Sequence, residues 1–298
     1  MINDIDVYGF PDDIKSQLHK KVDTFRKYDI YNNMDQKTKD KMIIIHNTYK
    51  MQRTNINYFF NSYLINKYCN FNSLTNFWSL FYSLDGIVDL SDPDTSLPNS
   101  LHALQTAEAI RKAGKPDWYI LCGLIHDMGK ILYLSGKDED GTSKTTQWAV
   151  VGDTFITGSI IPSNIVLSCY NNMNIDHNNN IIIPSNIGLS NCSVSFGHDE
   201  YMYRILKKCT TLLQTSIIPQ EALYIIRYHS LYAWHSSSSY DYLMDDTDRK
   251  MKSIVKEFSS FDLYTKDDMN IIKWNYELKD FYTKLVKKYI SKDMMIVY

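Results

Sequence analysis

The most constraining feature of the chain is the stretch CGLIHDMGK, residues 122–130, where three ionisable side chains interrupt an apolar run. The surrounding segment, residues 116–132, has the length and composition of a buried helix. His126 and Asp127 are adjacent, and Lys130 follows about one turn later. Burying one polar group without a partner costs on the order of a few kcal/mol. A fold that buries this stretch must therefore give the three side chains a common polar partner.

Apolar residues recur at helical spacing over much of the remaining chain, which indicates an all-α fold. No internal repeat and no linker rich in glycine or proline divides the sequence. We expect one helical domain over residues 25–298, with a few short extended segments, after a polar lead-in at residues 1–24. The segments predicted to be helical are 36–70, 101–113, 116–132, 197–213, 219–234, 249–266 and 270–290, and loops are expected at 86–99, 135–147 and 168–192.

Several residues are predicted to mark the ends of these elements. Asn99 or Ser100 is expected to cap the helix at residues 101–113, because short polar side chains accept hydrogen bonds from the first free amides. Gly114 is expected to end that helix, and Asp117 to cap the next one. The segment WAVVGDTF, residues 148–155, is too short to assign and is a candidate extended segment.

Composition excludes several classes of function. A formal net charge of −2 with well-mixed charges argues against a surface for nucleic acid or an anionic membrane. The chain has no apolar run of about 18 residues, and its acidic N-terminal segment does not resemble a signal peptide. The five cysteines are scattered and form no CxxC pair, as is typical of reduced thiols in the cytoplasm. The remaining metal-binding side chains are histidines and carboxylates, which suit iron, zinc or manganese.

Five of the eight histidines lie in predicted helices, and at four of these positions an unpaired imidazole would be costly to bury. Each one alone is typical of a core or capping residue, but four such sites and a carboxylate together indicate a shared metal centre. These four are His102, His126, His198 and His229. His46, which ends an aliphatic run, is interpreted as a satisfied or partly exposed core residue. His235 is interpreted as a surface residue, with a role behind the ligands as the alternative.

The adjacent His126 and Asp127 favour two metal ions over one. Neighbours on a helix point about 100° apart, so both reach one cluster only if it lies between them or if the carboxylate extends to a second ion. Asp127 is therefore predicted to bridge two ions. Lys130 shares this face and is predicted to bind a negatively charged substrate oxygen. The alternative for Lys130 is a lysine that ends a helix favourably.

Six segments, in order along the chain, resemble the inositol oxygenase family. They are LDGIVDLSDPDTSLPNSLHALQTAEAIRKAG, GLIHDMGK, QWAVVGDTF, GHDEYMY, IRYHSLYAWH and EFSSFDLYTK. The resemblance extends from about Arg26 to the C-terminus, over some nine-tenths of the chain. Motifs of this length and order are specific to one family.

This resemblance implies a helical fold of the HD-domain type with a non-haem di-iron site in the mixed-valent Fe(II)/Fe(III) state. It assigns three ligands to one iron, two to the other, and one bridging ligand. The implied ligands are His102, His126 and Asp262 for the first iron, His198 and His229 for the second, and Asp127 between them. Without the resemblance, Asp262 looks like an ordinary acid near the end of a helix.

The resemblance also implies the reaction, which is cleavage of the myo-inositol ring by O₂ to give D-glucuronate. The implied substrate-binding residues are Arg26, Asp89, Leu90, Ser91, Lys130, Gly152, Asp153 and Ser230, of which Lys130, together with Asp127, would also be catalytic. Leu90 stands where members of the family carry an acid, so a backbone contact there would persist and a side-chain contact would be lost. The loop at residues 135–147 looks longer than the family's.

Two other functions are compatible with parts of this sequence. An HD-type metal-dependent phosphohydrolase would use a similar ligand set but needs several basic residues to bind phosphate. Only Lys130 and Arg26 are candidates, amid several aspartates. The second alternative is a helical interaction protein without activity, which the intact ligand set disfavours. We expect a cytoplasmic monomer with no nucleic-acid or membrane partner.

Overall fold

The computed structural model describes residues 36–92, 97–213, 218–264, 272–290 and 293–298. Helix makes up 62% of it and strand 3%, which confirms the predicted all-α class. None of the described helices combines the length and apolar character needed to cross a membrane. The lead-in at residues 1–24 and the candidate substrate residue Arg26 lie outside the described residues.

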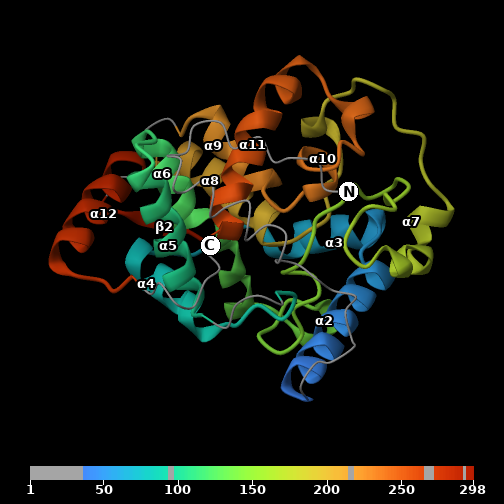
Figure 1. The fold of residues 1–298 in the computed structure, drawn as a ribbon, viewed down its shortest axis with the longest axis horizontal. Helices are drawn as coiled ribbons and strands as arrows, with labels where there is room; N and C mark the ends of the chain where they lie inside the picture. The colour runs from blue at the N-terminus through green and yellow to red at the C-terminus, as the bar shows by residue number, and fades with distance from the viewer. Residues whose placement is uncertain (1–35, 93–96, 214–217, 265–271, 291–292) are drawn as a thin grey trace.

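The elements are α-helices separated by loops and short 3₁₀ turns (Figure 1). The α-helices are α2 (Gln36–Asn55), α3 (Tyr58–Tyr68), α4 (Phe77–Ser83), α5 (Asn99–Lys112), α6 (Asp117–Ile125), α7 (Ile175–Asn178), α8 (His198–Leu213), α9 (Gln220–Tyr228), α10 (Tyr232–His235), α11 (Asp246–Tyr264) and α12 (Tyr276–Tyr289). The 3₁₀ elements are η1 (Leu84–Gly86), η2 (His126–Leu134), η3 (Asp138–Asp140), η4 (Ser168–Met173), η5 (Leu189–Asn191) and η6 (Asp241–Leu243). The strands are β1 (Leu74–Asn76) and β2 (Met295–Val297).

The centre of the hydrophobic core lies among α5, α6, α8, α9 and α11. Helix α5 packs on α6, and α8 packs on both α9 and η2. Each of the five helices contributes side chains that are fully or almost fully buried, such as Leu104, Ile125, Ile205, Ile225 and Phe258. Burial of apolar surface on this scale is the main stabilising term for such a fold. In Figure 1, α4 and α12 lie to one side of this centre, and α2, α3 and α7 lie to the other.

Two glycines permit the close approaches that bring the central elements together. A Cβ on Gly123 of α6 would lie 2.8 Å from the Cα atom of Ala107 in α5. A Cβ on Gly129 of η2 would overlap the carbonyl group of His198 at the start of α8. Because both contacts are with backbone, no rotamer change could relieve them. The motif HDMGK therefore places its polar residues directly against α8.

A short antiparallel pair of strands joins the C-terminal segment to the core. Leu74 of β1 pairs with Val297 of β2, and Asn76 pairs with Met295. Strand β2 also packs against α8, and its Ile296 side chain is fully buried. The sequence prediction allowed a few short extended segments but did not locate this pair. The candidate extended segment at residues 148–155 contains turns and no strand.

The helix at residues 36–70 was predicted as one element and is two. The break falls at Ile56 and Asn57, where the Asn57 side chain accepts hydrogen bonds from the amides of Phe59 and Phe60 and so caps α3. The segment at residues 219–234 is also divided, because α9 ends at Tyr228 and α10 begins at Tyr232. In both cases apolar spacing continues across the break, so periodicity alone does not reveal it.

The helix at residues 116–132 is likewise divided, into α6 and η2, and the change falls at His126. Three capping predictions are wrong. Asn99 and Ser100 lie inside α5, where their side chains bond to Ile87 and Asp85 instead of the helix amides. Asp117 is the first residue of α6 and makes no capping bond. Gly114 does follow the end of α5, with a left-handed φ of +71°.

The predicted loops are largely confirmed. Residues 135–147 contain only η3, and residues 168–192 contain only η4, α7 and η5. The C-terminal helix starts at Tyr276, later than predicted, because Asn275 caps it by accepting from the amide of Leu278. All five cysteines are free thiols, as predicted.

We predict that Gly123→Ala destabilises the protein by about 1–3 kcal/mol, because its methyl group would collide with the backbone of α5. The free energy of unfolding from urea titrations measures this. Lys112→Ala, on the exposed side of α5, is the control and should change stability by less than about 0.5 kcal/mol. Equal effects of the two substitutions would contradict the close packing of α5 on α6.

Candidate metal and substrate site

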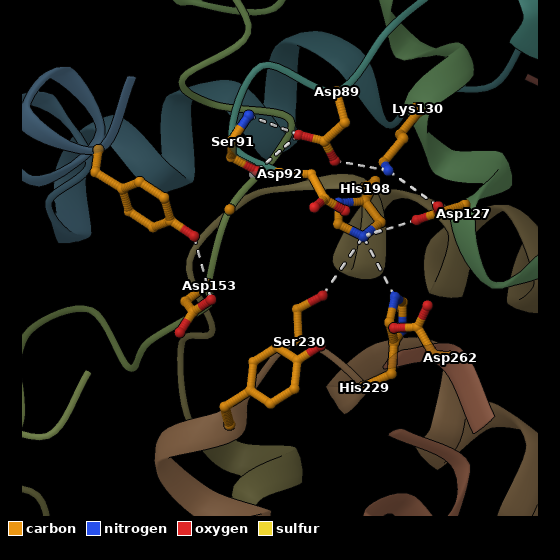
Figure 2. Close-up of a pocket in the computed structure, with 13 residues that line it drawn as sticks. Asp89, Ser91, Asp92, Asp127, Lys130, Asp153, His198, His229, Ser230 and Asp262 are labelled. Atoms are coloured by element: carbon orange, nitrogen blue, oxygen red, sulfur yellow. Dashed lines mark hydrogen bonds and ion pairs between the residues drawn. The ribbon is translucent and has the colours of Figure 1, made fainter. Parts of the chain in front are cut away.

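A cavity near the start of α8 collects most of the predicted site residues (Figure 2). It is lined largely by polar side chains drawn from distant parts of the sequence. The lining residues are Tyr49, Asp89, Ser91, Asp92, Asp127, Lys130, Gly152, Asp153, His198, His229, Ser230, Tyr232 and Asp262. The predicted metal ligands His102 and His126 do not line the cavity. They lie behind its lining residues, next to Asp262 and Asp127.

The first group of candidate ligands combines α5, η2 and α11. His102 Nε2 lies 2.8 Å from Asp262 Oδ1, and His126 Nε2 lies 3.5 Å from the same oxygen. Adjacent donors on one six-coordinate ion lie about 3 Å apart when the bonds are about 2.1 Å long. The three donor atoms therefore have the mutual spacing that one ion requires.

The second group combines the start of α8 with the end of α9. His198 Nε2 lies 3.3 Å from His229 Nε2, and both side chains are buried. His229 terminates α9, where the chain turns before α10. Asp199 lies beside this pair, with its Oδ1 atom 2.7 Å from His198 Nε2. These three residues form a second group with the spacing of metal ligands.

Asp127 lies between the two groups and presents one carboxylate oxygen to each. Its Oδ2 atom is 3.6 Å from His126 Nε2 and 4.0 Å from His102 Nε2, on the first side. Its Oδ1 atom is 3.4 Å from His198 Nε2, on the second side. This is the placement expected of a carboxylate that bridges two ions.

The backbone orients three of the four imidazoles with Nε2 facing inwards. The Nδ1 atoms of His126, His198 and His229 lie 2.9, 2.7 and 3.2 Å from the carbonyl oxygens of residues 123, 150 and 226. An Nδ1–H donated to a carbonyl leaves Nε2 with a lone pair for a metal ion. His126 Nε2 is buried and has no hydrogen-bond partner within the described part of the chain. A bound ion would satisfy this atom, so the donor set fits a metal centre.

Electrostatics keep the candidate bridging carboxylate charged. Burial acts to raise the pKa of Asp127, but Lys130 and the surrounding histidines outweigh it and hold that pKa well below its usual range. Burial also acts to lower the pKa of His198, yet Asp199 and Asp127 raise it to about 9. A metal ion at His198 must therefore displace a proton, so metal binding will release protons.

Lys130 is buried inside the cavity and does not simply end a helix. Its Nζ atom lies 2.7 Å from Asp89 Oδ2 and 2.9 Å from Asp127 Oδ2 (Figure 2). The same atom lies 3.2 Å from Asn99 Oδ1. Burial acts to raise the pKa of Asp89, but the Lys130 ammonium lowers it to about 2. Lys130 thus links the candidate bridging ligand to the polar wall of the cavity.

The predicted substrate residues mostly gather on that wall. Ser91 donates from its amide and its hydroxyl to Asp89 Oδ1, at 2.8 and 2.7 Å. Asp153 and Ser230 also line the cavity. Leu90 does not line it, and its amide donates to Gln147 Oε1 at 3.2 Å.

Sequence reasoning missed several residues at the site. Tyr49, Asp92 and Tyr232 line the cavity, and the Tyr49 hydroxyl lies 3.3 Å from Asp153 Oδ1. No spacing pattern marks the two tyrosines, because they come from different helices. Asp199 carried a usable signal, since His198 and Asp199 repeat the doublet of His126 and Asp127.

The predictions for His235 and His46, which were not assigned to the metal centre, have different outcomes. His235 was predicted to lie at the surface and is buried, with its Nε2 atom 3.0 Å from the carbonyl oxygen of His229. The residue instead supports the loop that carries a candidate ligand. His46 is partly buried and its Nδ1 atom lies 2.9 Å from the Tyr170 hydroxyl, which confirms it as a satisfied residue outside the site.

Comparison with known proteins identifies relatives that extend over the whole site. A sequence model of the family described as myo-inositol oxygenase matches residues 42–296. A Dictyostelium discoideum protein named inositol oxygenase is 41% identical over 228 residues, which cover 73% of each chain. The proteins named inositol oxygenase from Danio rerio and Mus musculus are 39% and 36% identical to this chain. The matches cover 82% and 93% of this chain, and 86% and 92% of the two relatives, respectively. The matched span contains every candidate site residue except Arg26.

We predict that Asp127→Asn lowers the bound iron from about two ions per chain to about one or fewer, because an amide cannot supply two anionic oxygens. Metal analysis after anaerobic reconstitution measures this. Asp176→Asn is the control, since this buried carboxylate accepts from the amides of Tyr58 and Gly158, away from the cavity. Full iron content in Asp127→Asn would exclude the bridging role.

Proposed function

The chain belongs to the myo-inositol oxygenase family, and from this premise we propose that its cavity binds myo-inositol beside two iron ions. The chain is an inositol oxygenase, and the reaction we assign to it is ring cleavage by O₂ to give D-glucuronate. The observation that carries the proposed site is the position of Asp127, with one carboxylate oxygen facing each buried group of ligands. Oligomeric state and cell compartment stay predictions.

The six residues implied by the family resemblance would hold the irons. The first iron would be held by His102, His126 and Asp262, the second by His198 and His229, and Asp127 would join them. Two bound irons would supply Lewis acidity and the capacity to exchange electrons with O₂. The protein contributes the position of the substrate and the exclusion of water, since these side chains are buried.

Lys130 is placed to stabilise negative charge on a substrate hydroxyl. Its ammonium lies between Asp89 and Asp127 and lines the cavity, so a hydroxyl bound in the cavity can approach this cation. Negative charge that develops on the oxygen of that hydroxyl would be stabilised by the ammonium.

The polar wall of the cavity supplies specificity for a polyol. Asp89, Asp153 and Ser230 offer oxygen atoms to the substrate's hydroxyl groups. A buried polar group left without a partner costs about 1–3 kcal/mol, so an isomer with one misplaced hydroxyl binds less well. Tyr49 and Tyr232 also line the cavity.

The alternative of a phosphohydrolase fits this cavity less well. Lys130 is the sole lysine or arginine among its described lining residues, whereas the carboxylates are Asp89, Asp92, Asp127, Asp153 and Asp262. This excess of negative charge opposes a phosphate ester and tolerates a neutral polyol. Oxygen consumption with myo-inositol, set against phosphate release from nucleotides, separates the two activities. Phosphate release without oxygen consumption would overturn the proposed function.

We predict that Lys130→Met keeps about two irons per chain but weakens myo-inositol binding about 10- to 100-fold, as expected for loss of a charged hydrogen bond. Anaerobic calorimetry and metal analysis measure the two effects. Lys67→Met is the control, because it removes a lysine from a carboxylate pair with Asp140, away from the cavity. Loss of all iron in Lys130→Met would show that Lys130 acts on the metal centre instead of the substrate.

A further inference from the structure

Asp199 is a buried carboxylate to which the proposed mechanism gives no role. It follows His198 at the start of α8, and its relative exposure is 0%. It does not line the cavity but lies directly behind Ser230 and the two histidines of the second group. Burying a carboxylate is costly unless its oxygens are hydrogen-bonded, so its partners indicate what it does.

We propose that Asp199 is a positioning residue that makes Ser230 a hydrogen-bond acceptor towards a substrate hydroxyl. The inference rests on the proposed function, because it assumes that myo-inositol occupies the cavity. It assigns Asp199 neither a contact with substrate nor a place among the metal ligands.

Two hydrogen bonds join Asp199 and Ser230. Asp199 Oδ2 accepts from the Ser230 amide at 3.1 Å, and Asp199 Oδ1 accepts from the Ser230 hydroxyl at 3.1 Å. An ionised carboxylate accepts hydrogen bonds and donates none, so the hydroxyl proton points at Asp199. Ser230 Oγ then presents only lone pairs to the cavity that it lines.

The contacts of Asp199 with His198 and His229 would change if these histidines bound a metal ion. Asp199 Oδ1 also lies 2.7 Å from His198 Nε2 and 3.5 Å from His229 Nε2. An imidazole nitrogen that binds a metal ion has no proton to donate, so these contacts cannot remain hydrogen bonds in the iron-loaded protein. The bonds to Ser230 are the ones that persist. With iron bound, Asp199 would therefore keep its hydrogen bonds with Ser230 and lose those with the histidines.

The hydrogen-bond acceptors of the cavity are complementary to a ligand with many hydroxyl donors. With Ser230 turned to accept, it matches the carboxylates of Asp89 and Asp153, which can only accept. Lys130, which is ion-paired with Asp89, supplies a strong donor beside these acceptors. Such a wall selects a ligand whose hydroxyls donate at most positions, which describes a cyclic polyol with free hydroxyl groups. An ether or a ketone at the Ser230 position would face an acceptor and lose its hydrogen bond.

The test is Asp199→Asn, measured as iron content and as the Kd for myo-inositol in anaerobic calorimetry on the reconstituted enzyme. An amide group can donate to Ser230 Oγ and release the serine proton into the cavity. We expect about two irons per chain and a Kd raised about tenfold. Ser230→Ala in the Asp199→Asn background should add little to that increase, because the two residues act as one unit.

Asp248→Asn is the matched control. Asp248 also has 0% exposure, and it accepts from the amides of Leu189 and Asp245 and from the Tyr224 hydroxyl, away from the cavity. This substitution should lower the melting temperature and leave the Kd for myo-inositol unchanged. It separates loss of a buried carboxylate in general from loss of the one behind Ser230.

Three results would overturn the inference. Loss of iron in Asp199→Asn would make Asp199 a metal ligand, and a wild-type Kd would leave it no role in binding. Additive effects of Asp199→Asn and Ser230→Ala would show that Asp199 does not act through Ser230. Failure of the wild-type protein to bind myo-inositol at all would instead overturn the proposed function, and this inference with it.

Discussion

The site depends on one carboxylate that reaches in two directions from the junction between α6 and η2. Asp127 has an oxygen facing each group of ligands, and its charge is maintained by Lys130 in the following turn. This arrangement requires η2 to lie against the start of α8. Gly129 allows that contact, because any side chain there would collide with the backbone of His198. The motif HDMGK thus supplies both the candidate bridging carboxylate and the glycine that lets η2 pack against α8.

The sequence predicted the fold class and the gathering of ligands well, because both follow from local chemistry repeated along the chain. Buried histidines need partners, and His102, His126, His198 and His229 do converge. Asp262 was different, since an acid near the end of a helix carries no local signal. Its place beside His102 depends on how α11 packs against α5, and it could be proposed only from the family resemblance.

Predictions failed where tertiary contacts override local preference. The Asn99 side chain could have capped α5, but it instead donates to Ile87 and accepts from Lys130, which draws it towards the site. His235 looked like a surface residue beside a run of serines and is buried behind His229. Tyr49 and Tyr232 reach the cavity from α2 and α10, whose positions no periodicity encodes. Residues that shape the cavity are therefore harder to predict than the candidate metal ligands.

The cavity's excess of carboxylates gives a physical reason for pairing metal ions with a neutral substrate. Asp89, Asp127 and Asp153 line one small cavity, and their mutual repulsion must be offset by positive charge. Lys130 neutralises part of it, and cations bound by the histidines would neutralise more. A neutral polyol leaves that balance intact, whereas an anionic substrate would compete with the carboxylates for the same cations. Charge balance and hydrogen-bond direction thus favour the same class of ligand.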